Sequence, residues 1–72
     1  MNVPPEARMG NDIARQLGHL PTAQAAEAIA DHIERFWEPR MRRNLEALVA
    51  AQDDALDPLV VDAAGLLAAR AS

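Results

Sequence analysis

The stretch TAQAAEAIADHIERFWEPRMRR, residues 22–43, contains the strongest helical pattern of the chain and its sharpest interruption. Between Ala23 and Trp37 apolar side chains recur every three or four residues, which predicts a helix with one buried face. The Glu38-Pro39 pair then predicts a sharp corner, because a residue before proline is biased away from the helical region and proline suits the first position of a new helix. The apolar face holds Ala26, Ile29, Ile33, Phe36 and Trp37, and the charged face holds Glu27, Asp31, Glu34 and Arg35.

A helix is also predicted before this stretch, beginning near Glu6. Its end is marked by Gly18 and Pro21, and we expect Gly18 to adopt the left-handed conformation that often closes a helix. Thr22 is then the expected N-cap of the next helix. Apolar spacing places Met9, Ile13 and Leu17 on one face of this first helix.

Two more helices are predicted after the corner. The first runs from Pro39 to about Gln52, and the second from Pro58 to about Arg70, after the acidic connection 53–57. Asp57 is the expected N-cap of the last helix, with proline in its first turn. The apolar stripe of the helix from Pro39 is Met41, Leu45, Leu48 and Val49, and that of the helix from Pro58 is Leu59, Ala63, Leu66 and Leu67.

The spacing of charged residues also allows two ion pairs between positions i and i+4. One is between Asp31 and Arg35, and the other is between Arg42 and Glu46.

These elements predict an all-α protein, a small bundle of three to four short helices with a sharp corner at Glu38-Pro39. With 72 residues and 7.8 kDa, one helical domain over residues 1–72 is expected, with residues 1–5 frayed. A chain of this size buries only about 60% of its unfolded surface. Many of its apolar residues are alanines, so the core is thin and a partner surface is expected to complete it.

The composition argues against catalysis by this chain. Cys, Tyr and Lys are absent, and Thr22 and Ser72 are the only hydroxyl side chains. Thiolate sites, disulfides and most nucleophiles are therefore excluded. His19 and His32 have no partners at metal-ligand spacing, and the glycines are too scattered for a phosphate loop. We expect no catalytic residue, no metal and no bound cofactor, with the acids of residues 27–34 forming a solvated face.

The net charge and the hydropathy pattern limit the classes of partner that this chain is expected to bind. The net charge of −4 and pI of about 4.9 argue against nucleic acid. Residues 1–5 lack the basic segment and apolar run of a signal peptide, and no apolar run approaches the roughly 18 residues that span a bilayer. We therefore expect a cytoplasmic protein that binds neither nucleic acid nor membrane.

The corner is the candidate interaction site. It contains both aromatic residues of the chain, and its three arginines begin a helix, where the macrodipole disfavours cations. Tryptophan and arginine are enriched in interface hot spots, and arginine binds carboxylates in a bidentate manner. The alternative is that the aromatics form the core of the corner and the arginines are solvated. The predicted partner interface comprises Phe36, Trp37, Glu38, Pro39, Arg40, Met41, Arg42 and Arg43.

The corner, residues 36–42, resembles the signature of the small delta subunit of cytoplasmic NAD-dependent formate dehydrogenases. Residues 9–14 and 28–33 resemble that family's first two helices, and residues 56–60 resemble the start of its last helix. The family tends to carry aromatics late in the first helix, where this chain has Gln16 and Leu17. Together these matches cover most of the chain.

The resemblance implies a non-catalytic accessory subunit that docks on the large catalytic subunit of a formate dehydrogenase and supports its stability or assembly. In such complexes the molybdenum or tungsten bis-pterin, the iron–sulfur clusters, FMN and NAD belong to other subunits, so none is expected in this chain. Two alternatives stay open: a transient assembly chaperone for the molybdoenzyme, and a free-standing helical interaction protein. Self-association of the isolated chain also stays open.

Overall fold

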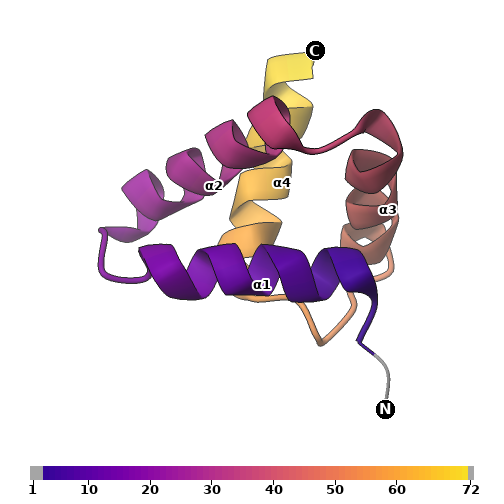
Figure 1. The fold of residues 1–72 in the computed structure, drawn as a ribbon, viewed down its shortest axis with the longest axis horizontal. Coiled ribbons are helices and arrows are strands. Elements are labelled where there is room, and N and C mark those ends of the chain that lie inside the picture. Colours follow the sequence, from indigo (N-terminus) through magenta and orange to yellow (C-terminus); the bar gives the residue numbers. More distant parts are fainter. Residues whose placement is uncertain (1–2, 72) are drawn as a thin grey trace.

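Four α-helices joined by short connections form the computed structural model, which describes residues 3–71 (Figure 1). They are α1, Pro5–Leu17; α2, Thr22–Phe36; α3, Pro39–Ala50; and α4, Pro58–Ala71, and residues 3–71 contain no strand. The predicted all-α class and the corner between α2 and α3 are confirmed. The expected fraying of residues 1–5 falls partly on Met1 and Asn2, which lie outside the described residues, whereas Pro5 is already the first residue of α1.

The helices cross rather than align as an up-and-down bundle. In Figure 1, α1 lies across the lower edge, α2 is inclined above it, and α3 and α4 stand more upright. α2 packs most extensively on α4, and α1 contacts all three other helices. The first and last helices of the chain, α1 and α4, are therefore in contact although they are far apart in sequence.

The core is built from a few large side chains set among alanines. Ile29, Ile33, Leu45 and Val60 are fully buried, and no polar or charged residue within 3–71 is buried. The predicted apolar face of α1 is shifted: Met9 is 43% exposed, while Ile13 and Leu17 only flank the core. Small residues replace them, because α1 approaches α4 closely and larger side chains fit only at the rim. The buried positions of α1 are Ala7, Gly10 and Ala14.

Two residues expected to mark helix ends, Gly18 and Thr22, do not have the predicted conformation or position in the structure. Gly18 has φ −64° and ψ −13°, a right-handed conformation, because the Leu20 N–H donates to the Leu17 carbonyl in a tight turn that needs no positive φ. Thr22 is the first helical residue rather than the N-cap, a position that Pro21 occupies without a side-chain hydrogen bond. By contrast, Asp57 caps α4 as predicted: its Oδ1 accepts from the Leu59 N–H at 2.9 Å.

α3 ends two residues earlier than predicted, at Ala50. Gln52 adopts φ 56°, in the left-handed region. The Gln52 N–H donates to the Val49 carbonyl at 3.0 Å and the Asp53 N–H to the Leu48 carbonyl at 3.1 Å. This pair of bonds is the Schellman motif, with glutamine at the position that glycine usually occupies.

Candidate protein-docking site

The corner is formed by two extended residues between α2 and α3. Trp37 has φ −89° and ψ 138°, and Glu38 has φ −70° and ψ 154°. The Trp37 N–H still donates to the Ile33 carbonyl at 2.9 Å, and the Arg42 N–H donates to the Glu38 carbonyl at 3.1 Å. Each helix therefore keeps a bonded end, and the direction of the chain changes within these two residues.

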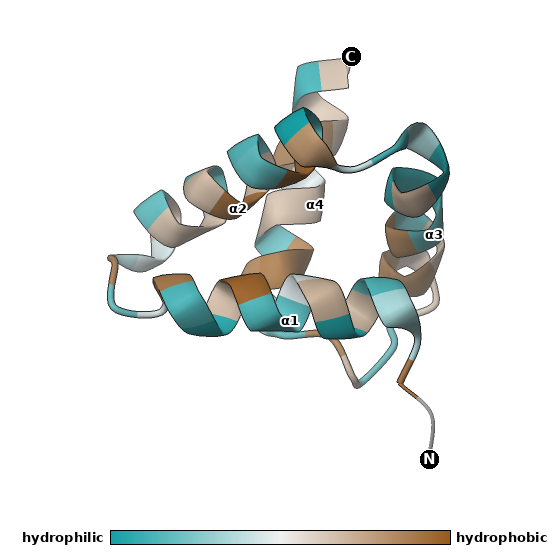
Figure 2. Cartoon of the chain, viewed as in Figure 1, coloured by the Kyte–Doolittle hydropathy of each residue, from teal (hydrophilic) through white to brown (hydrophobic). Residues whose placement is uncertain are grey.

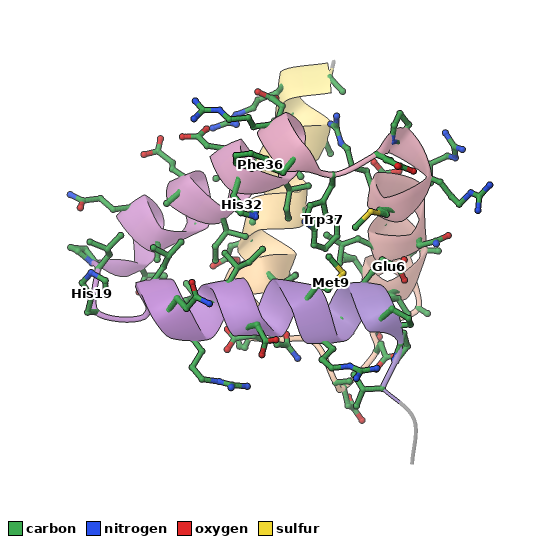
Figure 3. The ribbon with its side chains drawn as sticks, viewed as in Figure 1. Glu6, Met9, His19, His32, Phe36 and Trp37 are labelled. Carbon is green, nitrogen blue, oxygen red and sulfur yellow. The ribbon has the colours of Figure 1, made fainter. Side chains whose placement is uncertain are left out.

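The two aromatic side chains of the corner point to different environments (Figure 3). Trp37 is 6% exposed and belongs to the core cluster that also contains Ile33 and Leu45. Phe36 is 65% exposed and lies beside His32, one turn earlier on α2, with ring centroids 4.8 Å apart and planes tilted by 44°. Trp37 thus anchors the corner, and Phe36 presents apolar area to solvent.

The arginines of the corner have no ion-pair partner within residues 3–71. Arg40 and Arg43 are exposed and Arg42 is half-buried, and the first turn of α3 has neither an acidic residue nor a side-chain cap. Arg42 forms no ion pair with Glu46, which lies one turn along α3.

The expected pair between Asp31 and Arg35 is also absent from the described residues. Arg70 of α4 approaches Asp31 at 2.9 Å and Glu34 at 3.9 Å instead. Tertiary packing of α4 on α2 brings this guanidinium to both carboxylates.

The remaining corner residues divide between solvent and core. Glu38 and Pro39 are exposed, whereas Met41 is half-buried and packs against the core cluster. The solvent-facing part, here termed the corner surface, consists of Phe36, Glu38, Pro39, Arg40 and Arg43.

Sequence reasoning missed the structural importance of Asn11. Its Nδ2 donates to the Ala55 carbonyl at 2.6 Å, and its Oδ1 accepts from the Asp57 N–H at 2.8 Å. This amide clamp ties α1 to the connection before α4, 44 and 46 residues away in sequence. The nearby signal was Gly10: a Cβ at that position would lie 3.1 Å from the Val60 Cγ1, so α1 and α4 are in close contact there.

The histidines and carboxylates do not come together in a metal-binding group within residues 3–71. Within residues 3–71, no group of three or more His, Asp or Glu residues could hold a metal ion. His19 is exposed in the connection between α1 and α2, and His32 is engaged with Phe36. No helix of the described part is both long and apolar enough to cross a membrane.

Comparison with known proteins agrees with the corner motif. Neither curated proteins nor solved structures gave a match. The family model of the NADH-dependent formate dehydrogenase delta subunit, FdsD, matches residues 7–64, a span that includes the amide clamp and the whole corner. Since this match covers most of the sequence, the chain belongs to the family of delta subunits of NADH-dependent formate dehydrogenases.

Proposed function

We propose that this chain is a non-catalytic, cytoplasmic accessory subunit that docks on the large catalytic subunit of its formate dehydrogenase and supports the stability or assembly of the complex. The observation that carries the proposal is the corner surface, where an exposed phenylalanine ends α2 and arginines without an ion-pair partner within residues 3–71 follow in α3. The family match supports membership of such a complex.

The corner surface is unfavourable for the isolated fold. A cation in the first turn of a helix, such as Arg40 in α3, costs about 0.3–1 kcal/mol because it faces the positive end of the macrodipole. Phe36 exposes about two thirds of its area and gains little from the core. Arginine and aromatic side chains are enriched where interfaces derive most of their binding energy. We infer that Arg40 and Arg43 bind carboxylates of the catalytic subunit while Phe36 fills an apolar pocket there.

The cofactors of the parent complex do not fit this chain. A chain without cysteine offers no thiolate for an iron–sulfur cluster or a molybdenum centre, and its three glycines do not form a phosphate-binding loop. We therefore place the bis-pterin centre, the iron–sulfur clusters, FMN and the NAD site in the other subunits, and assign this chain no catalytic residue.

The proposal is tested with formate dehydrogenase purified from a strain that lacks this chain. The wild-type chain is expected to bind the large subunit and to slow the thermal inactivation of formate oxidation. The variants Phe36→Ala and Arg40→Glu with Arg43→Glu are expected to bind at least about tenfold more weakly. A matched control is Arg8→Glu with Arg15→Glu, which makes the same charge change on the exposed side of α1 and is expected to bind normally.

The same preparation separates the alternatives. Constant stoichiometry in the active enzyme supports a permanent subunit, whereas association only with enzyme that lacks its cofactors would identify a transient chaperone. If the wild-type chain does not bind any form of the enzyme, the docking proposal is wrong.

A further inference from the structure

A second surface lies on the outward side of α4. Two grooves run along this helix, one of about 720 Å³ between α4 and the start of α2, and one of about 380 Å³ between α4 and α3. Val61 and Gly65 border both grooves, so this part of α4 forms the ridge between them. We refer to these two residues and the grooves beside them as the α4 face.

The α4 face is unusually apolar for a surface. Asp62 and Arg70 are the only charged residues of α4. Much of this helix is coloured in the white-to-brown part of the hydropathy scale in Figure 2. A helix that is apolar on nearly all sides is normally surrounded by protein. Here Val60, Ala63, Ala64 and Leu67 are buried, but Val61 is 40% exposed and Gly65 is exposed. The isolated chain therefore covers only one side of α4.

Within residues 3–71, nothing sterically requires a glycine at position 65. A Cβ there would meet no atom of another part of the fold within 4 Å, whereas one at Gly10 would press against Val60 at 3.1 Å. Glycine inside a helix costs about 1 kcal/mol relative to alanine. Close approach of another backbone to the ridge would explain a glycine at this point.

The charged residues that line the two grooves indicate which kind of partner can bind there. Glu27 and Asp62 line the groove beside α2, and Glu46 lines the groove beside α3, while no basic side chain lines either one. A second copy of the chain that bound through its own α4 face would bring the same carboxylates, with no cation to meet them. A partner with arginine or lysine beside an apolar stripe would pair with them instead.

We propose that the α4 face binds an amphipathic helix of another formate dehydrogenase subunit, one whose apolar side lies on Gly65 and whose basic residues flank it. The inference rests on the proposed function for its partner, but it assigns a surface separate from the corner. A helix is the expected form of the partner because its side chains can enter the two grooves on either side of the ridge.

The test compares the chain with a Gly65→Leu variant in binding to the formate dehydrogenase that lacks it. Leucine at this position extends into open space, so the isolated variant is expected to melt at or above the wild-type temperature. Its affinity for the enzyme is expected to fall at least about tenfold, because the leucine side chain blocks close approach of the partner helix to the ridge. Ala47→Leu, at an exposed α3 position that lines neither groove, is the matched control and is expected to bind within about twofold of wild type.

Charge-reversal variants test whether the partner helix is basic. Glu27→Arg with Asp62→Arg is expected to weaken binding strongly, and Asp12→Arg with Asp54→Arg, at exposed acids outside both grooves, is expected to leave it nearly unchanged. Because the chain has no native cysteine, a benzophenone on Val61→Cys identifies the contacted segment by mass spectrometry. The expected segment is a helix of an enzyme subunit with an excess of arginine and lysine.

Several outcomes would overturn the inference. Normal binding by Gly65→Leu removes the site while leaving the corner proposal intact, and an acidic or non-helical cross-linked segment removes the stated occupant. A wild-type dimer that Gly65→Leu disrupts would identify a second copy as the occupant. Failure of the wild-type chain to bind the enzyme refutes the docking proposal and this one with it.

Discussion

Phe36 and Trp37 are adjacent in sequence and occupy opposite environments. The chain leaves the helical conformation at Trp37, which turns the indole into the core while Phe36 stays on the outer side of α2. The larger aromatic therefore packs in the core, and the smaller one remains largely exposed to solvent.

Replacement of each aromatic by alanine is expected to separate these contributions. Trp37→Ala removes a buried side chain from a thin core and is expected to lower the free energy of unfolding by about 3–5 kcal/mol. Phe36→Ala changes an exposed side chain and is expected to lower it by less than about 1 kcal/mol. Urea unfolding followed by circular dichroism measures both. Equal losses for the two variants would contradict the assigned environments.

At the scale of elements, the amide clamp of Asn11 ties α1 to the connection before α4. Side-chain caps are absent from α1, α2 and α3, so these helices depend on packing and on contacts between elements. Asn11 both donates to Ala55 and accepts from Asp57, which a simple apolar contact does not replace.

Asn11→Ala is expected to destabilise the chain by about 1–3 kcal/mol, because it leaves a partly buried carbonyl and N–H unpaired. Asn11→Asp keeps the acceptor for the Asp57 N–H but places a carboxylate against the Ala55 carbonyl, so it is not expected to restore stability. Thermal unfolding of the two variants beside wild type is the measurement. Full stability of Asn11→Asp would show that the bond to Ala55 contributes nothing.

The end of α3 offers a stabilising change. Gln52 holds a left-handed conformation that costs a residue with a Cβ about 1 kcal/mol and costs glycine little. Gln52→Gly is expected to raise the free energy of unfolding by about 0.5–1 kcal/mol, less the entropy that glycine gains when unfolded. The same substitution at Gln24, within α2, is the control and is expected to destabilise the chain.

The helix starts were predicted most accurately where the sequence contains proline. Pro39 and the Asp57-Pro58 pair begin helices in the structure as expected. The end of α3 was placed too late because Gln52 gives no local sign of a left-handed residue. Period alone put Phe36 and Trp37 on one face, and only the extended conformation at Trp37 separates them. The clamp of Asn11 depends on a tertiary approach over more than forty residues, which local patterns do not contain.

For the whole molecule, stability depends on the last helix. α4 is the main packing partner of α2, it contacts α1 and α3 as well, and its Arg70 bridges Asp31 and Glu34. Isolated helices of 12–15 residues are marginal in water. Without α4, the other three helices would keep mainly the packing of α1 on α2 and α3.

Removal of residues 58–72 is expected to abolish cooperative unfolding and most of the helical circular dichroism signal. A shortened chain that keeps residues 1–66, and with them Val60, Ala63 and Ala64, is the graded control and is expected to retain partial structure. A cooperative transition in the chain without α4 would show that α1 to α3 form a self-sufficient unit.

The dependence of α2 on α4 has a consequence for biosynthesis. The ribosome synthesises α1, α2 and α3 before α4, so the helix on which α2 packs most extensively emerges last of the four, and we expect the nascent chain to gain its stable packing only then. A chain that stops before α4 is expected to be a substrate for proteases rather than a smaller version of the protein.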